Sequence, residues 1–339
     1  YVASVADKVY LNPSGQIDWH GLASQTMFLK DALAKFGVRM QVVKVGAYKS
    51  ATEMFTGDKM SDANREQVTA FLGGIWQNVC QDVAKSRKVS VGQLNQYADN
   101  FITFAEPKSY VSMKLVDGLL YHDQLKDEVK KLMKLDKDDD ISTIGLAGIM
   151  NVPGGKEEGD EIAVYYAYGD IVDGASGAFS QSESVIDGTK VSKDLENLAD
   201  DDDVKAVVIR INSGGGSAYA SEQMWRAIQL VKAKKPVVVS MGGMAASGGY
   251  YMSCSANWIV AEPTTLTGSI GIFGMFPDMS GLITQKLGVK FDEVKTNKNS
   301  AFGTMARPFS EEEMAYLSSY ISRGYSLFRQ RVADGRHMR

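Results

Sequence analysis

Short apolar runs alternate with segments of helical periodicity through the second half of the chain. Apolar runs of about four to eight residues are typical of buried strands, whereas apolar positions three or four residues apart are typical of a helix face. The runs that predict strands are 162–168, 206–211, 237–240 and 258–260. The segments that predict helices are 193–199 and 218–232. This alternation predicts βαβ units, and hence an α/β fold around a parallel sheet.

The flanking regions are predicted from the same two periods. Before residue 134, the expected strands are 8–11 and 39–45. The helices expected there are 21–36, 61–83, 91–98, 108–115 and 122–133. After residue 271, the expected elements are helices at 279–287 and 310–331 and a strand at 290–295. Lys49 would therefore lie just past the end of a strand.

The start of the chain matches its second half in order and spacing, which indicates two related units in tandem. The matched positions are Tyr1 with Tyr251, Pro13 with Pro263, Gly21 with Gly271 and Gly37 with Gly288. The second unit has a front part whose counterpart would precede the chain, and the first has a tail whose counterpart would follow it. We therefore expect a window of a longer protein: a first unit at 1–133 without its front part, a linker at 134–161, and a second unit at 162–339 without its tail.

Composition and charge argue against several classes of function. With 339 residues, 44% hydrophobic and 23% charged, the chain has the composition of a soluble globular protein of about two domains. A net charge of -4 and the lack of a lysine-rich block argue against nucleic acid as a partner. Cys80 and Cys254 are far apart and have no metal-ligand spacing, so we expect neither a disulfide framework nor a zinc site. No run of about 18 apolar residues is present, so any membrane anchor is expected outside this chain.

Ser247 is the first candidate nucleophile. The segment Val237–Tyr250 predicts a strand, a glycine-rich bend after Ser240, and a helix that begins at about Ala246. A hydroxyl in the first turn of a helix is surrounded by free N–H groups and the positive end of the helix dipole, which stabilise a developing oxyanion. Small residues also occur at such bends simply because a helix must approach a sheet closely. The stretch alone does not decide between these interpretations.

A second glycine-rich turn, Asn212–Ser217, connects the strand at 206–211 to the helix at 218–232. It lacks both the Lys-Ser/Thr of a phosphate-binding P-loop and the spacing of a dinucleotide fingerprint. Its N–H groups are instead suited to a carbonyl oxygen, and together with the N–H of Gly248 they predict a two-donor oxyanion hole.

A nucleophilic serine needs a base. His20, His122 and His337 each fall in a turn, at the start of a surface helix or near the chain end, and are expected to be incidental. Lysine serves as a base where burial lowers its pKa from about 10.4 towards neutrality. Periodicity does not identify which lysine this is.

Four separated motifs together resemble the signal peptide peptidase A (protease IV) family. They are Val45–Ala51, Ile209–Gly216, Met241–Tyr251 and Leu266–Gly274. The resemblance covers nearly the whole chain, including the tandem repeat. One departure is that the family's Ser-Pro-Gly-Gly stands here as Ser213-Gly214-Gly215-Gly216, which loosens the turn and keeps its N–H donors.

The resemblance implies a fold of the crotonase and Clp protease superfamily, with two tandem ββα-repeat units, and a serine peptidase with a Ser/Lys dyad. Position by position, Ser247 matches the nucleophile and Lys49 the general base. Ser269 matches a serine that orients the lysine amine, and Gly215 and Gly248 match the oxyanion-hole donors. No metal and no cofactor is implied.

The repeat agrees with a shared site. In the second unit, the position that matches Lys49 is Asn299 or Ser300, so this unit lacks its own base unless Lys298 serves. We therefore expect the nucleophile from one unit and the base from the other, within a chain or between neighbouring chains.

The resemblance also implies the biological setting. It implies hydrolysis of apolar peptides such as cleaved signal peptides, at the bacterial cytoplasmic (inner) membrane, with the catalytic part facing the periplasm or outside. It further implies a membrane anchor absent from this chain and a ring-shaped homo-oligomer, which we expect to be a tetramer. Two alternatives stay open: a non-catalytic, ring-forming scaffold of the same fold, and an acyl-CoA hydratase or isomerase of the crotonase superfamily, which needs a carboxylate and no Ser247.

Overall fold

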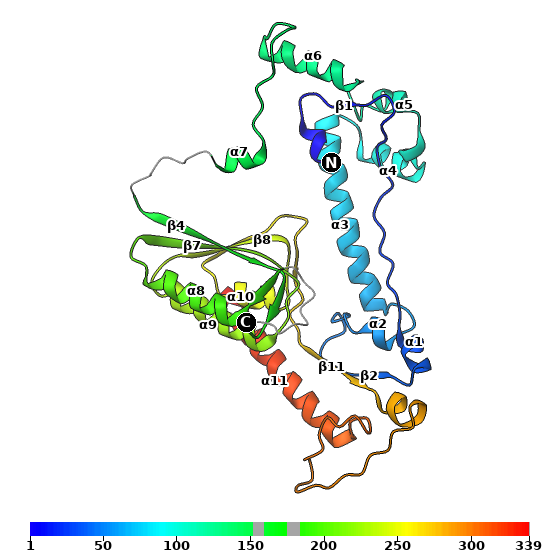
Figure 1. The fold of residues 1–339 in the computed structure, drawn as a ribbon, viewed down its shortest axis with the longest axis vertical. Helices are drawn as coiled ribbons and strands as arrows, with labels where there is room; N and C mark the ends of the chain where they lie inside the picture. Colours follow the sequence, from blue (N-terminus) through cyan, green and yellow to red (C-terminus); the bar gives the residue numbers. More distant parts are fainter. Residues whose placement is uncertain (152–158, 175–183, 339) are drawn as a thin grey trace. The chain divides into compact units, whose positions relative to one another are not determined.

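The computed structural model describes residues 1–151, 159–174 and 184–338, and contacts divide the chain into two compact units (Figure 1). The first unit comprises 1–23 and 72–159, and the second comprises 24–71 and 160–339. All five residues predicted to form the site therefore belong to the second unit. Contact units and sequence repeats describe different properties, so the predicted repeat boundaries stay a prediction.

The first unit is mainly helical. Its helices are most of α3 (Asp62–Arg87), α4 (Val91–Asp99), α5 (Pro107–Ser112), α6 (His122–Met133) and α7 (Leu146–Met150), with the 3-10 turns η1 (Val2–Val5) and η2 (Ile102–Phe104). Two short strands, β1 (Tyr10–Leu11) and β3 (Gly118–Leu119), pair in parallel. Leu94 and Tyr110 are fully buried, and the indole N–H of Trp19 donates to the Leu94 carbonyl oxygen at 2.9 Å. These side chains give the first unit a core of its own.

The second unit is built on a parallel five-stranded sheet, which confirms the predicted α/β class. The strands are β4 (Glu161–Tyr168), β7 (Val204–Ser213), β8 (Val237–Ala246), β9 (Trp258–Val260) and β10 (Leu266–Gly268). Their order is β10-β8-β7-β4, and β9 also pairs with β8. Two short strands, β5 (Asp170–Val172) and β6 (Val185–Asp187), form a separate parallel pair.

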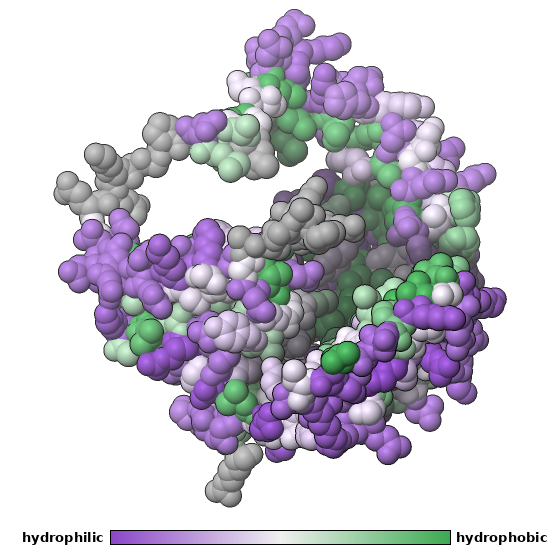
Figure 2. Space-filling model, turned by 60° about the horizontal axis from the view of Figure 1, so that its bottom comes forward, coloured by the Kyte–Doolittle hydropathy of each residue, from purple (hydrophilic) through white to green (hydrophobic). Residues whose placement is uncertain are grey.

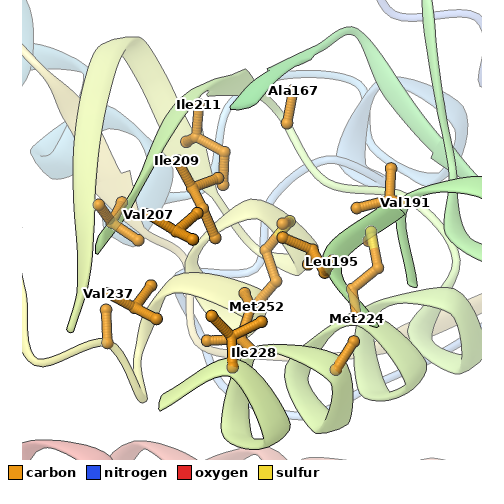
Figure 3. Close-up of a cluster of buried hydrophobic side chains, with 14 of the residues drawn as sticks. Ala167, Val191, Leu195, Val207, Ile209, Ile211, Met224, Ile228, Val237 and Met252 are labelled. Atoms are coloured by element: carbon orange, nitrogen blue, oxygen red, sulfur yellow. The ribbon is translucent and has the colours of Figure 1, made fainter. Parts of the chain in front are cut away.

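Three helices cover one face of this sheet: α8 (Gly188–Asp200), α9 (Ala218–Lys232) and α10 (Gly248–Ser253) (Figures 1 and 3). Alternate residues of β7, namely Val207, Ile209 and Ile211, are fully buried against them, as the period of a strand requires. Leu195 of α8 and Ile228 of α9 fill the same core. Burial of each such side chain contributes about 1.5–3 kcal/mol, which makes this layer the rigid base of the second unit.

A two-stranded antiparallel sheet joins residues 24–71 to the rest of the second unit. It consists of β2 (Arg39–Lys44) and β11 (Phe273–Asp278), with Lys44 opposite Phe273 and Arg39 opposite Asp278. Helices α1 (Lys30–Lys35), α2 (Glu53–Thr56) and α11 (Glu311–Arg336) contact this pair, and the π-helical turn η3 (Gly281–Lys286) follows it. The pairing joins two segments that are far apart in the sequence.

The second half of α11 is fixed to the helices below the sheet. Arg331 Nη2 donates to Glu222 Oε1 on α9 at 2.5 Å. The hydroxyl of Tyr251 on α10 donates to the same carboxylate at 2.5 Å, and its ring centroid lies 4.5 Å from that of Phe328 on α11. A buried cluster from three helices therefore holds α10 in place.

Three predicted elements differ from the structure. The helix predicted at 21–36 is confined to α1, since the N–H of Leu29 donates to the Met54 carbonyl oxygen at 2.6 Å instead of continuing a helix. The strand predicted at 290–295 is wrong: in the described part of the chain these residues pair with no strand, and Val294 is 97% exposed. The helix predicted at 279–287 is the shorter turn η3.

On the face shown in Figure 2, hydrophilic side chains are interspersed with patches of hydrophobic ones. Among the described residues, no helix has the length and apolar character needed to cross a lipid bilayer. Apolar side chains are also exposed on the sheet itself, namely Ile162 and Tyr166 of β4 and Trp258 of β9. On β4 these residues alternate with the buried ones, so they lie on the sheet face away from the helices.

The core of the second unit can be tested at Leu195, which has no exposed surface. Leu195→Ala leaves a cavity between α8 and α9, and we expect it to lower the free energy of unfolding by about 2–5 kcal/mol. Leu230→Ala, on the 37% exposed outer side of α9, is the matched control and should cost about 0.5 kcal/mol or less. Urea unfolding followed by circular dichroism measures both; equal midpoints would show that Leu195 does not support the core.

Candidate active site

Ser247 directly follows the carboxyl end of strand β8. The predicted bend after Ser240 is wrong, as is the helix start at Ala246: β8 continues through Gly242 and Gly243 to Ala246. Gly242 and Gly243 lie where the pairing of β8 with β7 shifts register, between Met241, which pairs with β7, and Met244–Ala246, which pair with β10. The helix α10 then starts only after Ser247.

The backbone of Ser247 is strained. Its φ of 52° and ψ of -118° lie in a region that non-glycine residues rarely adopt, at a cost of about 1–3 kcal/mol. Its N–H donates to the Gly268 carbonyl oxygen at 2.9 Å, and its C=O accepts from the N–H of Tyr251 at 2.8 Å. The turn is therefore held from β10 on one side and from α10 on the other.

Lys49 reaches Ser247 within the same chain. It follows β2 in an irregular segment, and its Nζ lies 3.1 Å from Ser247 Oγ across 198 residues of sequence. The antiparallel pairing of β2 with β11 brings the two segments together, since Lys44 at the end of β2 stands opposite Phe273. The structure thus brings together the two residues that the resemblance placed in a dyad.

Ser269 completes the surroundings of the lysine amine. Lys49 Nζ lies 3.0 Å from Ser269 Oγ and 3.3 Å from the Ser269 carbonyl oxygen, and 5.9 Å from the centre of the Phe273 ring. None of these polar neighbours carries a charge. Burial lowers the pKa of the Lys49 amine below its ordinary value of 10.5, because desolvation disfavours the ammonium form.

The glycine-rich turn after β7 packs directly on the Ser247 turn. Gly215 has φ of 101°, and a Cβ there would lie 2.6 Å from the backbone nitrogen of Gly248 and 2.8 Å from Ser247 Cβ. Only glycine allows this approach, which places the predicted oxyanion-hole residues Gly215 and Gly248 against each other. The turn is held by Ile171 of β5, whose N–H donates to the Gly215 carbonyl oxygen at 2.9 Å.

The N–H groups of this turn differ in their partners. The N–H of Gly215 donates to Ser213 Oγ at 3.1 Å, and the Ser213 hydroxyl donates to the Gly169 carbonyl oxygen at 2.7 Å. For the N–H groups of Gly216 and Gly248, no acceptor is found among the described residues. The predicted donor Gly215 is therefore engaged within the turn, while its neighbour Gly216 and Gly248 have N–H groups available.

The dyad lines a cavity of about 840 Å³, which accommodates a peptide segment. The apolar part of its wall is formed by Val68, Phe71, Leu266, Ile270 and Phe273. A neighbouring cavity of about 300 Å³ is also lined by Ser247 and Lys49 and extends to Tyr251 and Phe328. The walls of both cavities are suited to apolar side chains.

The other candidate bases do not fit. His20 interacts with Asp18 at 2.6 Å, and neither His122 nor His337 lines the cavity. Lys298 forms an ion pair with Glu312 at 2.5 Å, which raises its pKa, and 74% of its side chain is exposed. In the part of the chain that the structure describes, no cluster of three metal-ligating residues is found.

Sequence reasoning missed one wall of the cavity. Asn64, Gln67, Val68 and Phe71 line it from the first turns of α3. Their spacing puts them on one helix face, and the two polar residues on this otherwise apolar face were the signal available. Ser50, which follows Lys49, was also missed.

Comparison with known proteins agrees with the predicted resemblance. The family model for peptidase family S49 matches residues 1–136 and 229–339, and the Clp protease model matches residues 179–260. The chain is 36% identical over 343 residues to Protease 4 of Salmonella typhi, covering 99% of the chain and 54% of the relative. It is 35% identical over 364 residues to Protease 4 of Haemophilus influenzae (100% and 56%) and 31% identical over 348 residues to the chloroplastic serine protease SPPA of Arabidopsis thaliana (100% and 50%).

The chain thus spans about half the length of these curated relatives. The peptidase model nevertheless covers most of the chain, and its matched segments contain Lys49, Ser247 and Ser269. The chain belongs to peptidase family S49.

Proposed function

We propose that the chain carries the catalytic centre of a serine endopeptidase that uses a Ser247/Lys49 dyad. The observation that carries this proposal is the 3.1 Å separation of Lys49 Nζ and Ser247 Oγ. In the described part of the chain, no carboxylate is among the hydrogen-bond partners of the amine. An amine without an acidic partner, desolvated in a cavity wall, is able to stay neutral and accept a proton. Membership of peptidase family S49 supports the same conclusion.

The hydrogen bonds around Lys49 favour proton transfer from the Ser247 hydroxyl to the Lys49 amine. A neutral amine has two N–H groups and one lone pair. The hydroxyl and carbonyl oxygens of Ser269 accept the two N–H groups, which leaves the lone pair for the hydroxyl of Ser247. Ser269 is therefore assigned the orienting role that the family resemblance implies.

The reaction follows from this arrangement. Ser247 Oγ attacks the scissile carbonyl carbon while its proton passes to Lys49 Nζ. The resulting ammonium donates that proton to the leaving amine as the carbon–nitrogen bond breaks, and an acyl-enzyme remains. Water then gives a proton to Lys49, attacks the ester carbonyl and releases Ser247, which regains its proton.

The oxyanion of each tetrahedral intermediate needs donors close to Ser247. We assign one donor to the N–H of Gly248. The second comes from the turn of Gly215 and Gly216. Gly215 contributes if its N–H is shared with, or released from, Ser213 Oγ, and Gly216 offers an adjacent N–H that has no acceptor among the described residues.

The substrates proposed are apolar, unfolded peptides such as cleaved signal peptides. The apolar walls of both cavities support this class. We also propose that the whole protein acts at the bacterial cytoplasmic membrane, facing the periplasm or outside, through an anchor outside this chain. Self-assembly, as a tetramer, is proposed with it, and the exposed apolar side chains of β4 and β9 are compatible with such contacts.

The dyad is tested by removing each member. We expect Ser247→Ala and Lys49→Ala each to lower kcat for an apolar fluorogenic peptide by about 10³-fold or more, since neither residue works without the other. Lys298→Ala is the matched control and should keep nearly full activity. An active Lys49→Ala chain would refute the assigned base; an inactive wild type whose Ser247 also fails to react with a fluorophosphonate would favour the scaffold alternative.

The lowered pKa of Lys49 predicts a pH-dependent stability effect. Because its pKa is lower folded than unfolded, the folded chain binds fewer protons between that lowered pKa and about 10.5, and unfolding becomes less favourable as pH rises through this interval. We expect Lys49→Met to be stabilised relative to wild type at neutral pH, and this advantage to shrink as pH rises towards about 10.5. Urea midpoints of both chains over a pH series measure the difference; a constant or growing difference contradicts the assigned shift.

The close approach of Gly215 to the Ser247 turn is tested by Gly215→Ala. Its Cβ would meet the Gly248 nitrogen at 2.6 Å, so the oxyanion donors must move apart, and kcat should fall by about 10²-fold or more. Gly243→Ala is the matched control: its nearest neighbour would be Asn212 Oδ1 at 3.8 Å, and its activity should resemble wild type. Similar kinetics for the two variants would place the oxyanion hole elsewhere.

A further inference from the structure

The segment that carries Lys49 needs support from outside itself. Residues 45–52 form no helix or strand between β2 and α2. A general base nevertheless has to stay within hydrogen-bonding distance of its proton, and a displacement of about 1 Å lowers the rate about 100-fold. The contacts that hold this segment are therefore part of the catalytic geometry.

One such contact comes from α3. The side-chain Nε2 of Gln67 donates to Ser50 Oγ at 2.6 Å, and to Asn64 Oδ1 at 3.0 Å. Ser50 directly follows Lys49, so this bond acts on the chain one residue from the base. Both bonds are partly buried, which limits competition from water.

The helix that carries Gln67 is itself anchored next to Lys49. Glu53 of α2 is buried, and its carboxylate accepts from Ser61 Oγ at 2.7 Å and from the Ser61 N–H at 3.1 Å. Ser61 Oγ in turn accepts from the N–H of Asn64 at 3.2 Å and caps the start of α3. Burial opposes ionisation of Glu53, but the Ser61 bonds and Lys44, 3.7 Å away, outweigh it and keep the pKa below its usual value.

We propose that Gln67 is a positioning residue for the general base: by holding Ser50 from an anchored helix, it keeps Lys49 Nζ on Ser247 and against Ser269. The proposal rests on the proposed Ser/Lys function and adds a residue that does not itself touch the reacting atoms. Without the bond, the flexible lysine side chain gains access to the open part of the cavity. Water stabilises the ammonium form there. Lys49 is therefore protonated for more of the time, and its amine is next to Ser247 for less of the time.

Neighbouring charges do not account for this effect. Lys44 and Glu53 lie at the two ends of the Lys49 segment. Within it, the hydroxyl of Tyr48 donates a hydrogen bond to Glu66 at 2.7 Å. Asp170 and Tyr325 line the same cavity. Gln67 is neutral, so replacing it by alanine changes none of these charges. A shift of the pH profile in such a variant therefore reports a changed position or solvation of Lys49.

The test is a double-mutant cycle of Gln67→Ala and Ser50→Ala, measured as kcat and KM across the neutral and alkaline range. Each single variant should lower kcat about 10- to 100-fold with KM little changed, and move the acidic limb of the kcat profile to higher pH. The double variant should be no worse than either single one, because both remove the same bond. Gln77→Ala, an exposed glutamine farther along α3, is the matched control and should behave as wild type.

Several outcomes overturn the proposal: an unchanged pH limb in Gln67→Ala, additive losses in the double variant, or a raised KM alone, which would mean that Gln67 binds substrate. If Gln67→Ala does not fold, Ser50→Ala removes the same bond from the other side and decides the question.

The rate of Ser247 labelling by a fluorophosphonate, followed against pH, separates this proposal from the proposed function. Labelling does not depend on peptide binding. If the wild type neither labels nor hydrolyses at any pH, the dyad itself fails, and the positioning role with it. If the wild type labels faster as pH rises and Gln67→Ala follows the same curve, the dyad stands and the role of Gln67 is refuted.

Discussion

The antiparallel pairing of β2 with β11 is the interaction on which the site depends. It fixes Lys44 opposite Phe273, so that Lys49, a few residues after β2, meets Ser269, a few residues before β11. Strand β10 ends just before Ser269 and pairs with β8, which ends just before Ser247. These two strand pairings therefore fix the position of Lys49 relative to Ser247.

Two features of the site work against stability. Ser247 holds a backbone conformation that is unfavourable for a residue with a side chain, and Lys49 is partly withdrawn from water without an acidic partner. Both persist because many contacts fix the surrounding structure. Strand β8 pairs with β7 and shares a buried core with α8 and α9, and the cluster around Glu222 holds α10. Strain at a functional turn that is offset by a rigid core is a general property of catalytic sites.

The spacing of apolar residues correctly predicted those helices and strands whose formation depends mainly on their own residues. The helix at 218–232 and the strand at 258–260 have the predicted bounds, because apolar residues of the helix face the core and Ile259 of the strand packs against it. Strand β8 was predicted too short, since Gly242 and Gly243 look like a bend. They lie where the pairing of β8 with β7 shifts register, and pairing with β10 begins at Met244. The strand predicted at 290–295 had the right residues and no partner to pair with.

The site residues also differ in how far their local sequence indicates their role. Ser247 was a candidate from its own segment, because a serine between a buried strand and a helix can face free N–H groups, but the family resemblance was needed to choose it over a merely small residue. Lys49 was not, since its environment is made by a pairing across 198 residues, and only the family resemblance pointed to it. Gln67 was missed because its importance lies in one bond to Ser50 that no periodicity encodes.

The closure of the Lys49–Ser247 contact within a single chain has a genetic consequence. When a defective copy lacking the nucleophile is expressed together with one lacking the base, neither polypeptide holds a complete pair, whatever oligomer they form. Such alleles should fail to complement each other, in contrast to enzymes whose catalytic groups meet across subunits.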